Sequence, residues 1–482
     1  MSVIRRLLST TAAPALHDVV IVGGGPAGLL LLCALKNNPA TKQLRCTLVE
    51  ALLLQPVRDF AADPPACFHN RIISLTPKSV LFMQHKSGSW DFLHHDRIQF
   101  YDQMVAYDSQ DADARIHFDA SSALPSGLRV DIAAMCEVVH IQASLLRKVD
   151  ALNKQLPDDN QAVVVDGARV VDIVGGGSGA LGNASTDLAL DWPVVTLSNG
   201  DVLQARLLVG ADGQNSPVRA FAQIESRGWS YDCFGVVGTL KLQFNDYRDI
   251  AWQRFLTTGP LAILPLPDDN ATFVWSCTPE LADILTKVDD AIFPHLLNAA
   301  LTLEKTDLNY IYSLLKADPA DALVVDEIAW RTSLIPEQDL DEKYPVPISK
   351  LFASSKARFP LKFLHADTYI APRVALVGDA AHTFHPLAGQ GLNMGQSDVE
   401  LLVEALETGV DRGLDIGSTL VLDKYVANAW PNNHAMMGVC DKLHKIFSTD
   451  FLPIVALRGL GLKSLNYFDV VKDAMVKAIS GH

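Results

Sequence analysis

Short apolar runs alternate with glycine-rich turns and leucine-rich segments at the start of the chain. The run VVIV at 19–22 enters a turn with three glycines, and a segment rich in leucine follows it up to residue 38. A second apolar run, CTLVE, occupies 46–50. Short apolar runs bounded by turn residues predict buried strands, and a longer leucine-rich segment predicts a helix. The pattern therefore predicts a βαβ unit with parallel strands.

The rest of the chain contains a second strand–loop–helix pattern and a long stretch of strand-like runs. VALV at 374–377 precedes a loop broken by glycines and then a helical segment at 399–406. The stretch from 231 to 364 holds runs such as VVGTLKLQF and ATFVWSC, with a helical part near 280–304. From residue 421 onward the spacing of apolar residues is helical. We therefore predict an α/β protein with a sheet-based second domain and C-terminal helices.

The turn after the first apolar run has the spacing of a dinucleotide-binding site. Gly23, Gly25 and Gly28 form a G-x-G-x-x-G pattern, and Glu50 ends the second predicted strand. The glycines allow a tight turn, close approach to a pyrophosphate and close packing of helix on strand, while the acid can bond a ribose hydroxyl. The glycine pattern alone is weak evidence, but together with the strand, the helix and the acid it predicts a dinucleotide.

The loop GDAAHTFHPLAGQGLNMGQSD at 378–398 joins the later strand to its helix. Gly389 and Gly391 let the backbone approach a flat ligand, because no Cβ projects from them. Asp379 can accept hydrogen bonds from sugar-like hydroxyls, and the helix N-terminus suits a developing negative charge. Such a loop is often only a turn. A flavin, however, presents both features: a ribityl chain and an edge that becomes anionic on reduction.

Between these two lies the second motif of the chain, LLVGADGQNSPVR at 207–219, which makes the loop at 378–398 the third; it is an apolar run that ends in Asp212-Gly213 and is followed by Arg219. A strand ending in an Asp-Gly turn is common by itself. The order of the three motifs along the chain favours a shared site. Because the motifs are widely separated, the domain that they build must be discontinuous.

Together these motifs closely resemble the para-hydroxybenzoate hydroxylase-like FAD monooxygenases. The stretches NRIISLTPKS, AWQRFLTTGP and RFPL extend the resemblance over nearly the whole chain to the mitochondrial ubiquinone (coenzyme Q) biosynthesis monooxygenases of fungal type. The resemblance implies a discontinuous Rossmann-type FAD-binding domain like that of glutathione reductase, a β-sheet substrate domain and C-terminal helices. The expected boundaries are 18–90, 125–222 and 366–420 for the FAD-binding domain, 91–124 and 223–365 for the substrate domain with an insertion at about 317–347, and 421–482 for the C-terminal helical region.

The resemblance also assigns residues to the flavin site outside the three motifs. Arg71 and Gln142 match family positions near the FAD, although a surface arginine or a solvent-facing glutamine would give the same pattern. His382 and His385 stand three apart without a third ligand, so we predict no metal site. His385-Pro386 is expected to shape the loop over the flavin, and no further catalytic side chain is expected. The expected cofactor-binding residues are Gly23, Gly25, Gly28, Glu50, Arg71, Gln142, Asp212, Asp379, Pro386, Gly389, Gly391, Leu392 and Asn393.

Charge and the chain ends limit the partners and the location. The net charge of −15 argues against binding to nucleic acid. Residues 1–17 contain Arg5, Arg6, hydroxyl residues and no acid, which predicts a mitochondrial presequence outside the fold; a plain N-terminal tail is the alternative. No apolar run is long enough to predict a transmembrane helix. The lysine-bearing helices after 421 suit either a membrane surface or ordinary packing.

The family resemblance implies FAD as the cofactor and hydroxylation at ring carbon C5 of a polyprenylated phenol or aniline in ubiquinone biosynthesis. Reduced flavin and O₂ would form a C4a-hydroperoxide that transfers one oxygen to the ring. It further implies electrons from ferredoxin and ferredoxin reductase, contact with other coenzyme Q biosynthesis proteins, and peripheral attachment to the matrix side of the mitochondrial inner membrane. Two alternatives stay open. The first is an NAD(P)H-dependent hydroxylase of a soluble phenol, or a flavin reductase of isoprenoid double bonds in the same fold; the second is a flavin-bearing scaffold without turnover.

Overall fold

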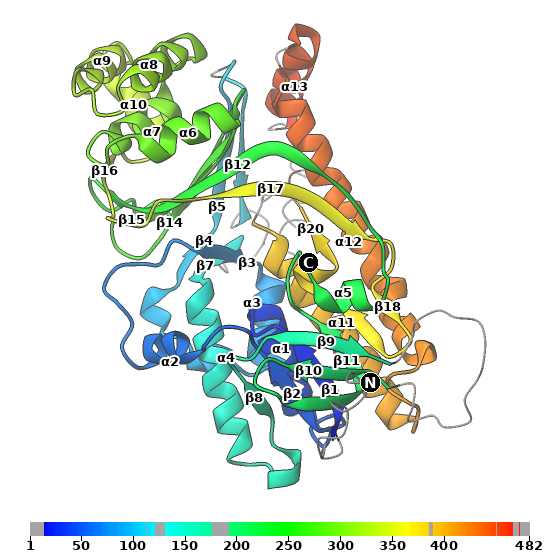
Figure 1. The fold of residues 1–482 in the computed structure, drawn as a ribbon. Helices are drawn as coiled ribbons and strands as arrows, with labels where there is room; N and C mark the ends of the chain where they lie inside the picture. Colours follow the sequence, from blue (N-terminus) through cyan, green and yellow to red (C-terminus); the bar gives the residue numbers. More distant parts are fainter. Residues whose placement is uncertain are drawn as a thin grey trace, which may run out of the picture.

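Large twisted β-sheets occupy the upper and lower halves of the molecule in Figure 1, and a small sheet lies between them. This computed structural model describes residues 14–111, 113–120, 131–175, 192–384, 389–449, 451–465 and 472. Each large sheet contributes to its own hydrophobic core. Both are built from segments far apart in the sequence, so the predicted α/β fold class with a discontinuous first domain is confirmed.

The first sheet is centred on the strand that leads into the first glycine motif. β1 (Ala15–Val22) pairs in parallel with β2 (Cys46–Val49) on one side and with β11 (Val202–Gly210) on the other. β11 also pairs in parallel with β19 (Val374–Leu376). The ends of β1 and β11 nearest the motifs, and all of β2 and β19, are buried, as expected when helices cover both faces of a parallel sheet. The outer strands are β8 (Val163–Val165), β9 (Val170–Val174), β10 (Val194–Leu197) and β18 (Ile370–Ala371).

Parallel pairing brings the three sequence motifs to one edge of this sheet. β1, β11 and β19 point the same way, so each ends at the same edge and continues there into its motif. Ligands of open α/β sheets bind beyond this carboxyl edge. The helices that follow the three motifs are α1 (Pro26–Asn37), α5 (Pro217–Phe221) and α11 (Gly391–Asp411), and the remaining helices around the sheet are α2 (Gln55–Ala62), α3 (Pro77–His85) and α4 (Val138–Asn153).

The second sheet is mostly antiparallel and carries helices on one face (Figure 1). Phe273 on a central strand shares a core with Phe293 and Val324 on these helices. The predicted insertion at 317–347 is therefore part of this helical layer. The strands are β5 (Gln103–Asp108), β6 (Arg115–Asp119), β12 (Ser226–Leu242), β13 (Ile250–Leu256), β14 (Gly259–Pro265), β15 (Asn270–Cys277), β16 (Ile348–Leu351), β17 (Ala357–Ala366) and β20 (His382–Thr383). The helices are α6 (Pro279–Lys287), α7 (Phe293–Thr302), α8 (Lys305–Ala317), α9 (Leu323–Thr332) and α10 (Glu337–Lys343).

The long strands β12 and β17 connect the two halves of the molecule as an antiparallel ribbon (Figure 1). The short strand β20 pairs with β17 through His382 opposite His365. Since β20 lies within the loop of the third motif, that loop is hydrogen-bonded to the second sheet although it starts from the first.

The small sheet corrects one predicted domain boundary. β3 (Ile72–Leu75) and β4 (Gln99–Tyr101) each pair with β7 (Ala133–Glu137). The sequence prediction placed 91–124 in the substrate domain, but the segment before β4 packs into the core of the first sheet. The prediction is wrong for residues 91–101, because only the later strands of that segment join the second sheet.

The chain ends also depart from the predicted boundaries. Residues 15–17 pair with β11, so they belong to the fold and not to an excluded presequence; residues 1–13 lie outside the described part. At the other end, α12 (Thr419–Phe447) begins before 421, and its first half packs into the core of the first sheet. α13 (Leu452–Leu465) follows it along the same flank (Figure 1). Among the described helices, none combines the length and apolar character needed to span a bilayer.

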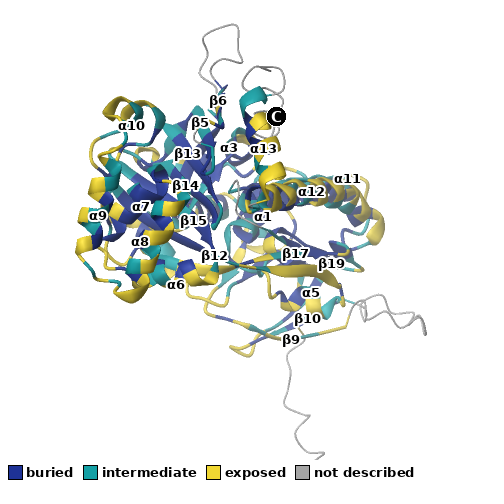
Figure 2. Cartoon of the chain, turned by 90° about the horizontal axis from the view of Figure 1, so that it is seen from above, coloured by how far each residue is buried: buried dark blue, intermediate teal, exposed yellow. Residues whose placement is uncertain are grey.

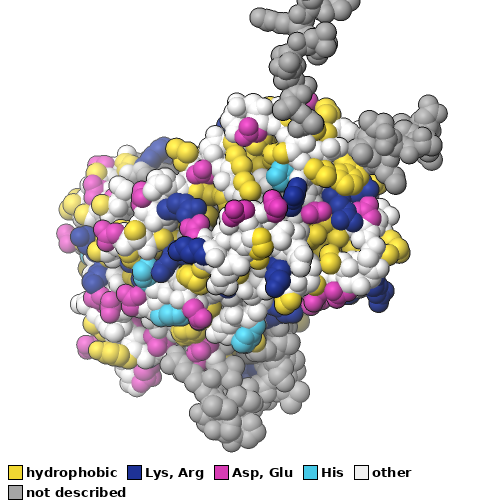
Figure 3. All heavy atoms as spheres, turned by 90° about the horizontal axis from the view of Figure 1, so that it is seen from below, with side chains coloured by type: hydrophobic (Ala, Val, Ile, Leu, Met, Phe, Trp, Pro, Cys, Tyr) yellow, Lys and Arg dark blue, Asp and Glu magenta, His cyan; other side chains and the backbone are white. Residues whose placement is uncertain are grey.

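Burial and charge are distributed unevenly over the molecule. Figure 2 shows buried residues concentrated between the second sheet and its helices, and exposed residues along the outer sides of α12 and α13. On the face shown in Figure 3, basic and acidic side chains lie among one another. The net negative charge is therefore not gathered into one acidic patch on that face.

Candidate active site

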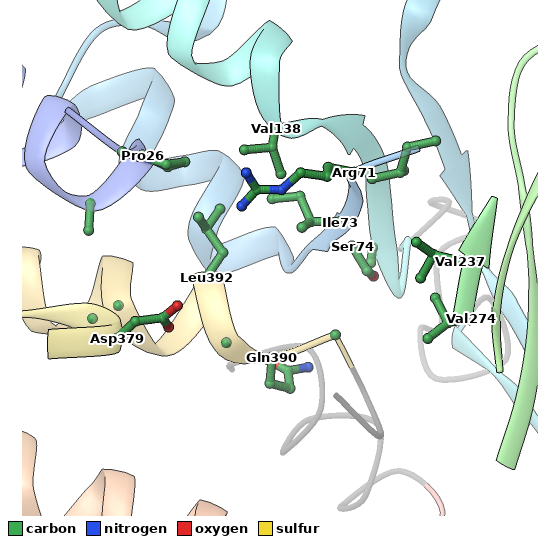
Figure 4. Close-up of a pocket in the computed structure, with 18 of the residues that line it drawn as sticks. Pro26, Arg71, Ile73, Ser74, Val138, Val237, Val274, Asp379, Gln390 and Leu392 are labelled. Carbon is green, nitrogen blue, oxygen red and sulfur yellow. The ribbon is translucent and has the colours of Figure 1, made fainter. Parts of the chain in front are cut away.

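A cavity of about 600 Å³ lies at the carboxyl edge of the first sheet, where the second sheet faces it. Residues from both sheets and from all three sequence motifs line it, and Figure 4 shows side chains converging on it from several elements. Of the predicted cofactor-binding residues, those at the wall of the cavity are Gly23, Gly25, Glu50, Arg71, Asp212, Asp379, Gly389, Gly391 and Leu392.

Gly25 and Gly391 lie at the starts of α1 and α11. Their backbone, which carries no side chain, faces the cavity. Among the described residues, a Cβ added to either would meet no atom within 4 Å beyond its chain neighbours and its own helix turn. Gly25 has φ −68°, a value open to any residue, so backbone conformation does not require glycine there. Neither packing nor conformation explains the missing side chain at Gly25. A ligand held close against the free N–H groups of the α1 N-terminus does explain it.

Gly23 and Gly28 have a different role, which is internal packing. Gly23 has φ +112°, and a Cβ there would lie 2.2 Å from the carbonyl oxygen of Ala211. A Cβ on Gly28 would lie 2.0 Å from the carbonyl oxygen of Gly23. Gly28 therefore does not line the cavity; it allows α1 to pack directly against the end of β1. These two glycines hold the first motif against the Asp212 motif.

Glu50 and Gln142 hold the peptide groups of Gly24 from two sides. One carboxylate oxygen of Glu50 accepts the Gly24 N–H at 2.5 Å, and the other accepts the N–H of Leu52 at 2.8 Å. Gln142, on α4, donates its side-chain amide to the Gly24 carbonyl at 2.9 Å. Gln142 thus lies behind the glycine loop and not at the cavity wall, and it does not face solvent freely.

Asp212 is a buried carboxylate with one oxygen in use. Its Oδ2 accepts the N–H of Val218 at 3.2 Å, while its Oδ1 is buried and has no partner among the described residues. Burial raises the pKa of Asp212, and hydrogen bonds from Ser216 and Val218 oppose that rise. Arg219 donates to the carbonyl of Ala380 at 2.6 Å, which ties this motif to the third. An orphaned buried oxygen at a cavity wall fits a ligand hydroxyl.

Asp379 and Arg71 reach into the cavity from opposite walls (Figure 4). Asp379 is an exposed residue that lines the cavity, and the protein packs around the rest of its side chain. Burial raises its pKa, and the nearby charges of His382 and Arg71 pull the pKa down. The acidic Asp379 and the basic Arg71 thus flank the space between the N-termini of α1 and α11.

Beneath Asp379 lies a buried network that the sequence did not reveal. Asp398 accepts the Nε2–H of His382 at 2.6 Å and the N–H of Gly378 at 2.9 Å through one oxygen, and the side-chain amide of Asn433 at 2.7 Å through the other. Burial lowers the pKa of His382, but the Asp398 carboxylate raises it more, so it lies above the ordinary value. His382 is therefore a partner of Asp398 and not half of a histidine pair. Asp398 follows Gly391 by seven residues, two helical turns, a spacing that places both on one face of α11.

Two further predicted residues of the third motif differ in position. Leu392 lines the cavity, whereas Asn393 is buried away from it. The side-chain Oδ1 of Asn393 accepts from the Thr76 N–H at 3.1 Å, and its side-chain Nδ2 donates to the backbone carbonyl of Ser74 at 2.8 Å. Asn393 therefore fixes α11 to the small sheet. His385 and Pro386 lie outside the described residues.

The far half of the cavity is an apolar chamber beneath the second sheet. Strands β13, β14 and β15 each present alternate residues to it, as the two-residue repeat of a strand requires. The opposite face of the same strands carries large side chains such as Trp252, Phe273 and Trp275. The chamber exists because the residues on its own side are smaller. Those from the second sheet are Met104, Val237, Ala251, Gln253, Pro260, Ala262, Leu264, Val274, Ser276 and Phe359.

A few polar groups interrupt this apolar lining. The hydroxyls of Ser74 and Tyr101 lie 2.9 Å apart, and Gln253 projects from β13. Burial raises the pKa of Tyr101, so its phenol stays protonated and able to donate. Sequence reasoning missed these residues because they are scattered over three strands, and the residue types carry no signal outside the fold.

Comparison with known proteins identifies the ligand that such a site holds. A family model described as an FAD binding domain matches residues 326–437. The Saccharomyces cerevisiae protein named ubiquinone biosynthesis monooxygenase COQ6, mitochondrial, is 44% identical over 479 residues, covering 98% of this chain and 95% of the relative. The Schizosaccharomyces pombe protein of the same name is 35% identical, covering 99% of this chain and 94% of the relative. The crystal structure of PqsL, a probable FAD-dependent monooxygenase from Pseudomonas aeruginosa, has the same fold, with a TM-score of 0.62, 20% identity, and coverage of 93% of this chain and 99% of PqsL.

The bare backbone at Gly25 and Gly391 and the orphaned oxygen of Asp212 fit FAD, whose pyrophosphate and hydroxylated chain need these features. The predicted cofactor is confirmed: the chain binds FAD and is a flavin-dependent monooxygenase. With relatives that match it from end to end, the chain belongs to the family of mitochondrial ubiquinone biosynthesis monooxygenases.

Proposed function

We propose that this protein hydroxylates the C5 position of the aromatic ring in a polyprenylated phenol or aniline, as a step of ubiquinone biosynthesis. The observation that carries the proposal is the continuity of one cavity, with a dinucleotide half and an apolar half. The names of the relatives supply the pathway. When bound and reduced, FAD supplies the activation of O₂ for transfer of one oxygen atom to an electron-rich ring.

In this proposal the residues of the first sheet hold the cofactor. The α1 N-terminus at Gly25 receives the pyrophosphate, and Glu50 lies at the end of β2 where a ribose hydroxyl is bound in this fold. Asp212 and Asp379 accept hydrogen bonds from hydroxyls of the ribityl side of the cofactor. The α11 N-terminus at Gly391 presents its positive dipole end to the flavin edge that gains negative charge on reduction.

The second sheet positions the substrate and keeps water away. Small apolar side chains such as Ala251, Ala262 and Val274 leave room for a ring and the start of a prenyl chain. Gln253 and the Ser74–Tyr101 hydroxyl pair are the polar groups available to orient a phenol or an aniline nitrogen. An apolar chamber also limits loss of activated oxygen to side reactions with water.

The protein is mitochondrial, as its relatives are. We propose that it attaches peripherally to the matrix side of the inner membrane and works among other coenzyme Q biosynthesis proteins. We further propose ferredoxin and ferredoxin reductase as the electron source. The family resemblance of the sequence motifs supports these points.

Two measurements on the purified holoprotein test the proposed reaction. Enzyme reduced by ferredoxin and then mixed with O₂ and a prenylated phenol should release a product one oxygen heavier, hydroxylated on the ring. Absence of this product would support the scaffold alternative. Fast reduction of the flavin by NADPH alone would contradict the proposed electron route and favour the NAD(P)H-dependent alternative.

Replacing Asp379 with alanine should weaken FAD binding about ten- to a hundredfold, because a hydrogen bond to a charged acceptor contributes about 1.5–3 kcal/mol. Titration of the apoprotein with FAD, followed by flavin fluorescence, measures the change. Asp379→Asn is the matched control: it keeps an acceptor oxygen without the charge and should lose less affinity. Equal affinity in the alanine variant and the wild type would refute contact between Asp379 and FAD.

Replacing Glu50 with glutamine should have a smaller effect, about tenfold weaker FAD binding. The two carboxylate oxygens accept the N–H groups of Gly24 and Leu52, and an amide would turn one acceptor into a donor facing a donor. Such a mismatch costs about 1–3 kcal/mol, part of which loosens the glycine loop. The same FAD titration checks this, and a variant that binds FAD as tightly as wild type would contradict it.

A further inference from the structure

The C-terminal helices expose a row of large apolar side chains. Leu452, Leu457 and Leu460 on α13 have 77%, 70% and 64% of their surface exposed. Others continue the row back along α12 at helical spacing. We call this set the C-terminal apolar face; its members are Val439, Leu443, Ile446, Phe451, Leu452, Leu457 and Leu460.

This face is not simply the outside of a loosely attached helix, because the inner side of α13 is firmly anchored. Arg458 and Asp108 form an ion pair at 2.6 Å with both side chains almost fully buried. Arg458 also donates to the carbonyls of Phe447 and Thr449, which fixes the elbow between α12 and α13. Leu462 packs into the core beside the second sheet. The apolar residues on the outer side are thus held outward on a fixed scaffold.

Charge on this part of the chain differs from the rest. Residues 438–465 contain four basic and two acidic residues, in a chain whose net charge is −15. Of the acids, Asp441 is buried against Lys445, and Asp450 lies outside the described residues. Asp111, which lies beside α13, is paired with Lys463. Arg458 is likewise paired with Asp108, so the face is close to neutral in an acidic chain, and the exposed Lys442 lies outside these ion pairs. A near-neutral apolar face suits the surface of a bilayer that contains anionic lipid better than an acidic one does.

Another exposed apolar area provides the contrast. Leu323 and Leu334, at the start and just beyond the end of α9, are as exposed as the leucines of α13, at 70% and 68%. The sequence between 318 and 342 around them holds eight acidic residues and one basic residue. The excess of acidic residues around α9 opposes the approach of this area to an anionic membrane. Exposure alone therefore does not distinguish the two areas, but charge does.

The C-terminal apolar face also lies close to the apolar half of the cavity. Phe447 and Leu462 share a hydrophobic cluster with Ala251, which lines the cavity from β13. Phe447 stacks on Phe255 of the same strand, with ring centroids 3.8 Å apart. The hydrophobic cluster against which α13 packs therefore includes a residue of the chamber wall, which places α13 near the apolar half of the cavity.

We propose that the C-terminal apolar face inserts into the surface of a phospholipid bilayer and brings the apolar end of the cavity to the lipid. The proposal rests on the proposed function in that it makes the bilayer the source of the polyprenylated substrate. Insertion is driven by burial of the leucines, and the lysines add attraction to anionic lipid.

Flotation of the full-length, FAD-loaded protein with vesicles tests the proposal. The vesicles are phosphatidylcholine alone and phosphatidylcholine with phosphatidylglycerol. Wild type should float with both, and more with the anionic vesicles. The variant carrying Leu457→Glu and Leu460→Glu should bind at least about tenfold more weakly, since burying one leucine side chain changes an equilibrium constant by about a factor of ten or more. The matched control, Leu323→Glu with Leu334→Glu, should float like wild type.

Other outcomes would overturn the proposal. These are wild-type protein that does not float, or an α13 variant that floats as well as the control. A variant with a lower melting temperature or a changed oligomeric state, and unchanged flotation, would show that the face is covered by the chain itself or by a second copy. Turnover of a detergent-solubilised prenylated phenol, without vesicles, is measured in parallel: its absence in wild type would count against the proposed function and not against membrane insertion.

Discussion

Replacing Gly25 with valine should weaken FAD binding by at least about a hundredfold while the apoprotein stays folded. The added Cβ would meet no atom of the described residues within 4 Å beyond its chain neighbours and its own helix turn, so we expect the empty fold to accept it. With FAD present, the same space is the approach to the N–H groups at the start of α1, and a branched side chain would hold the pyrophosphate away from them. The N-cap position itself costs about 1 kcal/mol, since valine caps a helix less well than glycine.

Two measurements separate this effect from misfolding. FAD affinity comes from titration of the apoprotein, and the melting temperature of the apoprotein reports the fold. Gly28→Val is the matched control: its Cβ would lie 2.0 Å from the carbonyl oxygen of Gly23, so this variant should lose stability even without FAD. If Gly25→Val bound FAD normally, or if it unfolded the apoprotein as Gly28→Val does, the ligand explanation for Gly25 would be wrong.

The glycine pattern in the sequence predicts the location of the cofactor better than the role of each glycine. Gly25 and Gly28 belong to the same motif, yet one faces the cavity and the other faces a carbonyl of its own loop. Spacing along the chain cannot distinguish the two. The difference depends on how α1 sits on β1 and on the position of Ala211, which comes from a distant segment.

The substrate half of the cavity was harder to predict from the sequence than the cofactor half, for a related reason. Strand-like runs in 231–364 predict a sheet, and β12 and β15 occupy the two runs singled out there. Which face of the sheet would be lined with small residues depends on the helices that cover the other face. Ala262 and Val274 acquire a function only because Phe273 and its neighbours are drawn into the helical core.

The domain boundaries failed where a single element serves two parts of the fold. The helix that starts at Thr419 continues past the expected limit at 421, and its first half is buried in the core of the first sheet while its end contacts the second. The short strand at His382 likewise belongs to the flavin loop but pairs with β17. Such sharing leaves no change of composition in the sequence, so no boundary signal exists to be found.

Replacing Asp398 with alanine should destabilise the protein by about 3–5 kcal/mol, the usual cost of removing one partner from a buried ion pair. The Asp398 side chain is 1% exposed, and its loss leaves His382 and the N–H of Gly378 without their acceptor. Because Gly378 precedes Asp379, the turn that carries Asp379 into the cavity should also loosen, and FAD retention should fall. Chemical unfolding of the holoprotein and its bound flavin measure the two effects.

The loss of stability on replacing Asp398 should depend on pH, and this dependence identifies the electrostatic part of the stabilisation. The pKa of His382 is raised in the folded protein by Asp398, so the pair contributes stability that is fully present below the unfolded histidine pKa of about 6.5. That contribution is lost as the pH rises through the higher folded pKa. The stability difference between wild type and Asp398→Asn, which keeps the shape and lacks the charge, should therefore be largest at the acidic end and shrink as the pH increases. A difference that is constant with pH would mean that Asp398 acts only as a neutral hydrogen-bond acceptor for the Gly378 turn.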